Sequence, residues 1–221
     1  RLFGIAAVLL DLNDPQKIVG RTKGPIIAPE EPYELVGHVR SVTFPTGALI
    51  DGEVLNIYYG AADTTSCVAR VKLNDLLSSI YPESAPTWHL SRYEKNPILK
   101  PEVGHAWERK AVFNPATLEL DGTVHILYRA LAEDNTSTIG YASSRDGFAI
   151  HERGEEPVYV PREPFEMKKV ENANSGCEDP RLTKIGETIY MTYTAFDGIG
   201  PPRVAVATIS EKDFLAKHWS W

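Results

Sequence analysis

The sequence is poor in the residues that mark several large protein classes. Its 221 residues include only two cysteines, Cys67 and Cys177, and no Cys-x-x-Cys pair occurs. A disulfide framework and a cysteine zinc site are therefore excluded, and we expect two free thiols in the cytoplasm. The longest apolar run, Leu2 to Leu10, is far shorter than the ~20 residues of a membrane-spanning helix, so we expect no membrane partner.

Positive charge is also scarce. The chain has 23 lysines and arginines against 30 aspartates and glutamates, which gives a formal net charge of −7. Duplex nucleic acids and anionic membranes both attract a basic surface, so we expect neither as a partner. The six histidines include no pair four residues apart on a predicted helix, and we expect no metal site.

Long helical patterns are missing as well. Only Leu73 to Ile80 and Glu211 to Lys217 have a helical pattern, and each is long enough for about two turns. The rest of the chain alternates short runs of Val, Ile, Tyr and Thr with turns, and it contains 16 glycines and 16 prolines. This pattern predicts an all-β protein.

Three kinds of segment recur in a fixed order along the chain. Hairpins with a turn glycine and an aromatic second strand are predicted at 50–62, 120–130 and 185–195. Strands rich in small residues begin at Gly4, Cys67, Ile139 and Val204. Segments bracketed by prolines begin at Gly24, Asn96 and Glu156, and we expect them to be edge strands because proline cannot donate to an inner ladder.

This order gives about three periods, each with about four strands. Four-stranded units in series are the sequence signature of the blades of a β-propeller, and an irregular β-sandwich is the alternative. Propellers usually carry about 4–8 blades, so three periods would leave exposed edge strands. We therefore expect either a longer parent chain or a homo-oligomer whose copies supply further blades.

The segment Gly-Cys-Glu-Asp-Pro-Arg at 176–181 is the strongest candidate for chemistry. It places two carboxylates and a guanidinium at the entry to a strand. Pro180 disfavours helical geometry before it, so we expect Asp179 to be extended and to lie at a strand or loop mouth. Burial would raise the pKa of a carboxyl group there, as a general acid requires. A structural Asp–Arg pair is the alternative.

At these residues the chain resembles the β-mannoside phosphorylases of glycoside hydrolase family 130, which are five-bladed propellers. The resemblance rests on YYGAADT at 58–64, VFNPATLELDG at 112–122, LYRA at 127–130 and GCEDPR at 176–181. Residues 1–84 resemble the C-terminal blades of such an enzyme, and residues 85–221 resemble its N-terminal blades. The segments that normally lie between them are absent from this sequence.

The resemblance also implies a reaction and a set of site residues. The reaction is inverting phosphorolysis of β-1,4- or β-1,2-mannooligosaccharides, which releases α-mannose 1-phosphate, with inorganic phosphate as co-substrate and no other cofactor. Asp179 matches the catalytic acid, and Glu178 stands where many members have tyrosine. The matching substrate-binding residues are Asn114, Arg129, Arg181, Asp63 and Phe44. Two alternatives stay open, namely a β-mannoside hydrolase of the same family and a non-catalytic propeller fragment that binds sugar.

Overall fold

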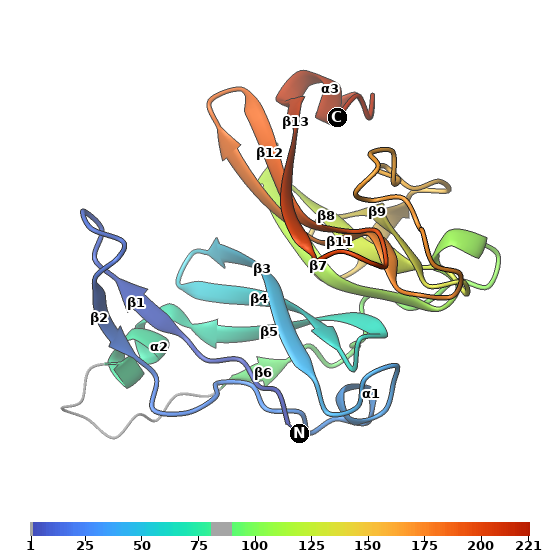
Figure 1. Ribbon diagram of the computed structural model, residues 1–221. Coiled ribbons are helices and arrows are strands. Elements are labelled where there is room, and N and C mark those ends of the chain that lie inside the picture. Colours follow the sequence, from blue (N-terminus) through green and yellow to red (C-terminus); the bar gives the residue numbers. More distant parts are fainter. Residues whose placement is uncertain (1, 81–89) are drawn as a thin grey trace.

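Most of the regular secondary structure of the protein is antiparallel β-strand (Figure 1). The computed structural model describes residues 2–80 and 90–221. A small sheet pairs β1 (Val8–Leu10) with β2 (Ile18–Arg21). A four-stranded sheet has the order β3 (Thr43–Asp51), β4 (Val54–Ala61), β5 (Thr65–Lys72) and β6 (Ser91–Arg92). The boundary predicted between residues 84 and 85 lies outside the described residues.

The third sheet combines two antiparallel units. One unit contains β7 (Ala111–Leu120), β8 (Thr123–Leu131), β9 (Thr136–Ser144) and β10 (Ile150–Arg153). The other contains β11 (Ser175–Ile185), β12 (Thr188–Phe196) and β13 (Arg203–Ser210). Two parallel residue pairs between β9 and β11 join them. The first strands of the three larger units, β3, β7 and β11, contact one another, so these units meet along their first strands.

The prediction of an all-β protein is confirmed, and the predicted hairpins are present. The pairs β3–β4, β7–β8 and β11–β12 close at turns where Gly52, Gly122 and Gly186 have φ of 57°, 69° and 59°. Glycine adopts such positive φ without steric cost, which is why these turns could be predicted from sequence. The third unit departs from prediction, since it has three described strands where we expected about four.

The proline-bracketed segments were wrongly predicted to be edge strands. Each forms a single isolated bridge instead, through Ile27 to Ile5, Leu99 to Ser66 and Tyr159 to Ile139. Flanking prolines remove backbone N–H donors, so the ladder cannot extend beyond that bridge. The fourth strand of a unit is a short segment just before the proline-bracketed one, as β6 and β10 show.

Helices are few and short, as predicted. They are α1 (Pro32–Leu35), α2 (Leu73–Ile80), the 3-10 helix η1 (Ala106–Glu108) and α3 (Glu211–Leu215). The predicted helix at 73–80 is confirmed, while the one predicted at 211–217 ends at Leu215, shortly before Lys217 takes a φ of 57°. None of the helices in residues 2–80 and 90–221 is long and apolar enough to cross a membrane.

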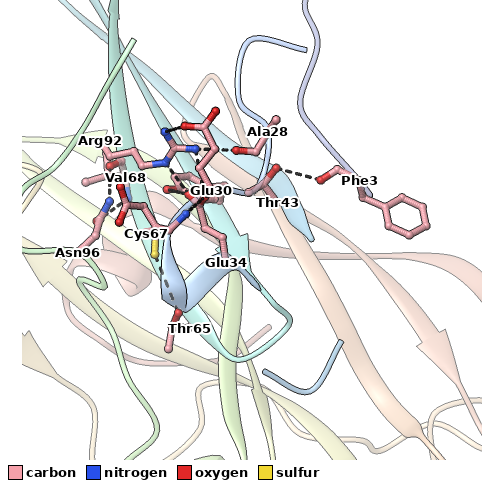
Figure 2. Close-up of polar contacts among 12 residues, drawn as sticks. Phe3, Ala28, Glu30, Glu34, Thr43, Thr65, Cys67, Val68, Arg92 and Asn96 are labelled. Atoms are coloured by element: carbon pink, nitrogen blue, oxygen red, sulfur yellow. Dashed lines mark hydrogen bonds and ion pairs between the residues drawn. The ribbon is translucent and has the colours of Figure 1, made fainter. Parts of the chain in front are cut away.

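A buried glutamate links the loop before each complete unit to the unit's second and fourth strands. In the first unit, Glu34 is fully buried and accepts hydrogen bonds from Tyr59 Oη of β4 at 2.8 Å and from Arg92 Nε of β6 at 2.7 Å. Figure 2 shows Arg92 facing Glu34 and Glu30 while it also donates to the Ala28 carbonyl. Buried Cys67 lies in the same region, and its thiol is free, as is that of Cys177.

The second unit repeats this arrangement. Glu108 is fully buried and accepts from Tyr128 Oη of β8 at 2.8 Å and from Arg153 Nη2 of β10 at 2.7 Å. We call each glutamate, tyrosine and arginine set a glutamate staple: Glu34, Tyr59 and Arg92 in one unit and Glu108, Tyr128 and Arg153 in the next. A buried carboxylate requires such partners because its desolvation is costly. The staples thus fix each proline-bracketed loop to its sheet.

Candidate functional site

The candidate site lies where the first strands of the units meet. Strands β7 and β11 each contain a register shift at an X-Pro pair, between Phe113 and Ala116 and between Glu178 and Arg181. Asn114 and Asp179 occupy the same place in these two bulges, and both have a φ of 52°. Bulges redirect a side chain out of the ladder, and Asn and Asp tolerate left-handed backbone better than other non-glycine residues.

This geometry corrects one expectation. Asp179 is not extended, although it precedes Pro180, because the bulge in β11 imposes left-handed backbone. Asp179 also lies within β11 rather than at its entry, and its side chain lines a cavity.

A glycine on the neighbouring strand β4 makes room for Asn114. A Cβ atom added at Gly60 would lie 2.1 Å from Asn114 Oδ1, closer than atoms can approach without displacement. Asp63 follows β4 in a turn, with a φ of 48°. The first unit therefore contributes both the space for the amide and a third acidic side chain.

The polar side chains form one hydrogen-bonded cluster. Asn114 Nδ2 donates to Asp179 Oδ1 at 2.8 Å, and Arg129 Nη1 of β8 donates to the same oxygen at 3.3 Å. Arg129 also donates to Glu178 Oε1 at 2.8 Å and to Ser137 Oγ at 3.0 Å. Its guanidinium carbon lies 4.9 Å from the centre of the Phe113 ring. Arg129 is thus fixed by three hydrogen bonds and one aromatic contact, and it orients the carboxylates of Glu178 and Asp179.

A cavity of about 270 Å³ opens onto this cluster. Five of the six predicted site residues line it, namely Phe44, Asp63, Asn114, Arg129 and Asp179, together with Phe3, Val39 and Val42. Arg181 lies outside it and lines an adjacent cavity of about 240 Å³ with Asp179. Its Nη1 donates to the Pro45 carbonyl at 3.4 Å, and its guanidinium faces the Phe44 ring at 5.9 Å.

Two carboxyl groups of the cluster hold their protons more tightly than usual. Burial raises the pKa of Glu178, and the nearby charges of Asp179 and Asp63 add to this effect, while Arg129 opposes it. Burial likewise raises the pKa of Asp63, with Asp179 adding and Arg129 and His38 opposing. The raised pKa values of Glu178 and Asp63 therefore favour the protonated forms of these two carboxyl groups.

Replacing Glu178 by glutamine should change how stability depends on pH. In the folded state Glu178 keeps its proton to higher pH than in the unfolded chain, so the free energy of unfolding falls as pH rises above 4.5 through the raised pKa. Glutamine does not titrate. Thermal melts at pH 4.5 to 8 should show the melting temperature of Glu178→Gln rising steadily relative to the parent.

The control for this series is Glu187→Gln, because Glu187 is exposed at the β11–β12 turn. Its melting temperature should keep a constant offset from the parent over the same pH range. A constant offset for Glu178→Gln as well would contradict the raised pKa of Glu178.

Sequence reasoning missed several residues of the site. It counted Glu178 as one of the two carboxylates at 176–181 and as a departure from the family but assigned it no role in the site, although Glu178 holds the Arg129 guanidinium. Ser137 and Phe113 were not singled out, and neither were the apolar cavity residues Phe3, Val39 and Val42, although Val42 lies two positions before the predicted site residue Phe44. The X-Pro pair shared by β3, β7 and β11 is the sequence signal that could have indicated the bulges.

A second acidic cluster, formed by Glu102, His105 and Glu108, has ligand atoms close enough together to hold a metal ion. The Glu108 oxygens, however, already accept from His105, Tyr128 and Arg153. These bonds explain the cluster as part of a glutamate staple.

Comparison with known proteins identifies the family. The model of a family described as beta-1,4-mannooligosaccharide phosphorylase matches residues 2–81 and 89–218. The chain belongs to this family, glycoside hydrolase family 130. The resemblance seen in the site motifs is thereby confirmed.

Curated relatives match parts of the chain. A "Beta-1,2-mannobiose phosphorylase" from Thermoanaerobacter sp. is 40% identical over 124 residues, which are 50% of this chain and 38% of that protein. A "Beta-1,4-mannooligosaccharide phosphorylase" from Ruminococcus albus is 33% identical over 86 residues, or 38% of this chain and 26% of that protein. The chain therefore matches well under half the length of these relatives.

Solved structures agree on the fold. An α-L-arabinofuranosidase from Lactobacillus brevis superposes with a TM-score of 0.56 at 15% identity, covering 92% of this chain and 61% of that one. Another, from Clostridium thermocellum, gives a TM-score of 0.51 at 13% identity, covering 76% and 48%. The chain shares the all-β fold of these propeller-type glycoside hydrolases.

Proposed function

We propose that this protein catalyses inverting phosphorolysis of β-mannosides and releases α-mannose 1-phosphate. The single observation that carries the proposal is the cluster of Asp179, Asn114, Arg129 and Asp63 on one cavity wall, contributed by separate units. The names of the relatives, which are mannobiose and mannooligosaccharide phosphorylases, supply the substrate class.

In this proposal Asp179 is the general acid that assists departure of the leaving sugar. A phosphorolytic enzyme needs one carboxylic acid, since the attacking phosphate is itself the nucleophile. Asn114 and Arg129 both donate to Oδ1 of Asp179, so its Oδ2 is the oxygen positioned to carry the proton. Asp63 and Asn114 would bind sugar hydroxyls, and Phe44, 39% exposed at the rim, would stack on the acceptor sugar.

Phosphate requires cations, and Arg181 is the best-placed candidate. Arg129 is fully engaged by Glu178, Asp179 and Ser137, whereas Arg181 is exposed and donates only to a backbone carbonyl among the described residues. Arg181 also lies beside Asp179 on the adjacent cavity. Its planar guanidinium can bind phosphate through two parallel hydrogen bonds.

One observation favours hydrolysis as a second candidate. Inverting hydrolysis uses a second carboxylate to activate water, and the site holds Asp63 and Glu178 in addition to Asp179. Asp63 lines the same cavity as Asp179 and could take that role.

We further propose that the three larger units are blades of a five-bladed propeller. In this arrangement residues 1–84 correspond to C-terminal blades and residues 85–221 to N-terminal blades, and a longer chain or a homo-oligomer supplies the others. The support is the repeated unit and the convergence of β3, β7 and β11.

The decisive assay supplies β-1,2- and β-1,4-mannobiose with and without inorganic phosphate. Phosphate-dependent release of α-mannose 1-phosphate, followed by proton and phosphorus NMR, would support phosphorolysis. Release of mannose without phosphate would identify the hydrolase, and sugar binding without turnover would identify a binding module. Arg181→Ala should raise the KM for phosphate while it leaves the KM for mannobiose within a few-fold.

A further inference from the structure

The outer edges of the third strands share one pairing pattern. A residue that bridges to a proline-bracketed segment is followed, three positions later, by a residue that pairs with an arginine. The bridging and arginine pairs are Ser66–Leu99 and Ala69–Arg92 on β5, and Ile139–Tyr159 and Ala142–Arg153 on β9. The N-terminal sheet repeats the pattern with Ile5–Ile27 and Val8–Arg21.

Strand β13 has the same register but a bare outer edge. In the pairing of the second and third strands, Ala205 of β13 is the partner of Tyr193. The equivalent partners are Cys67 and Tyr59 in the first unit, and Gly140 and Tyr128 in the second. Val204 therefore corresponds to Ser66 and Ile139, and Ala207 corresponds to Ala69 and Ala142. No strand of residues 2–80 and 90–221 pairs with this edge, and the Val204 side chain is 83% exposed.

A third buried glutamate lies behind this edge. Glu166 is fully buried and accepts from the backbone amides of Arg162 at 2.8 Å and Glu163 at 2.9 Å, and from the hydroxyl groups of Tyr193 and Tyr159. Glu34 likewise accepts from two backbone amides and a tyrosine. Within the described residues, however, Glu166 has no arginine or lysine at ion-pair distance, unlike Glu34 and Glu108.

A groove runs along this unpaired edge and is lined by the two tyrosines that donate to Glu166, while Glu166 itself is buried beneath them. Its volume is about 560 Å³, and its lining includes Tyr159, Tyr193, Val204, Ala207 and Trp221, together with Arg162 and Arg203. The groove therefore contains the outer edge of β13 and the two tyrosines that donate to Glu166. In the first two units, the equivalent surface is covered by a fourth strand and its arginine.

We propose that the outer edge of β13 and this groove bind an extended segment in which an arginine, paired opposite Ala207, reaches Glu166. About six residues after the arginine, an apolar residue between two prolines pairs with Val204. This chain contains that pattern twice, as Arg-x-x-x-Pro-x-apolar-x-Pro at 21–29 and 153–161. The occupant is thus a partner segment of this chemistry, recognised by addition of a strand and by a buried ion pair.

The segment that completes the neighbouring unit serves as the probe. A fluorescein-labelled peptide with the sequence of residues 150–161, IHERGEEPVYVP, should bind the protein saturably in fluorescence anisotropy. The same peptide with Arg153→Ala should bind about tenfold more weakly or worse, because hydrogen bonds to a charged group are lost.

Matched variants of the edge locate the binding. Val204→Pro removes a backbone donor and should abolish binding of the peptide. Val204→Thr keeps the donor, so its dissociation constant for the peptide should be within about threefold of the parent value. Melting temperatures of both variants show whether the fold is intact. The Glu166→Gln variant should bind the parent peptide more weakly than the unmodified protein does. Its affinity for the parent peptide should be close to its affinity for the Arg153→Ala peptide.

Three results would overturn the proposal. The first is no saturable binding of the parent peptide by folded protein. The second is equal binding of the parent and Arg153→Ala peptides. The third is a dimer that Val204→Pro converts to a monomer while the peptide never binds, which would assign the edge to a second copy of this chain.

Discussion

Turnover of a β-mannobioside by the Asp179→Asn variant is expected to be about 10²–10⁴-fold lower than that of the parent. Asparagine keeps an oxygen that can accept from Asn114 and Arg129, so the cluster should retain its shape. It cannot supply a proton to the departing sugar. Binding of mannobiose, measured by calorimetry, should stay within a few-fold of the parent.

The leaving group separates an acid from a structural aspartate. The phenolate of an aryl mannoside is a good leaving group and needs little protonation. Asp179→Asn should therefore lose far less activity on an aryl mannoside than on mannobiose. Asp121→Asn is the matched control, because Asp121 also has a positive φ, 50°, but lies at the exposed β7–β8 turn. Equal modest losses on both substrates, with a lowered melting temperature, would mean that Asp179 only stabilises the bulge.

The second large effect concerns stability. Arg153→Met removes the arginine from the fully buried Glu108 and leaves it His105 and Tyr128 as side-chain partners, and breaking a buried ion pair typically costs about 3–5 kcal/mol. For a chain of this size each kcal/mol corresponds to roughly 2–4 °C, so the melting temperature should fall by roughly 6–20 °C. Thermal unfolding followed by circular dichroism measures the change.

Two further variants test whether the lost ion pair with Glu108 causes the drop in stability. Arg145→Met changes an exposed arginine nearby and should alter stability by no more than about 0.5 kcal/mol. Glu108→Gln combined with Arg153→Met removes both charges and should recover part of the loss. If Arg153→Met melted like Arg145→Met, the staple would contribute little to stability.

Local chemistry explains which parts of the fold could be predicted. The hairpins depend on residues adjacent in sequence, since Asp121 and Gly122 both take positive φ in the turn that they form. The staples could not be predicted in the same way, because Glu108 and Arg153 are brought together only by the packed unit. The proline-bracketed segments were taken as strands for the same reason, since their single bridges depend on the neighbouring strand.

The site shows the same division. The motifs around Asn114, Arg129 and Asp179 carried the resemblance, and the structure brings these three side chains into contact. The left-handed backbone of Asp179 was missed because the preference of a residue before proline was outweighed by the bulge. Glu178 was undervalued because only the folded arrangement places it on Arg129.

The hydrogen bond between Asn114 and Asp179 also links the two antiparallel units of the third sheet. Its partners are 65 positions apart, one on β7 and one on β11, and each is held in its own bulge. A ligand that contacts both side chains would bind the arrangement in which the two units are in contact, and it would stabilise that arrangement by mass action. A sugar bound there would therefore hold the two units together, and a substitution that weakens the contact between β7 and β11 would lower affinity for sugar even with every site residue intact.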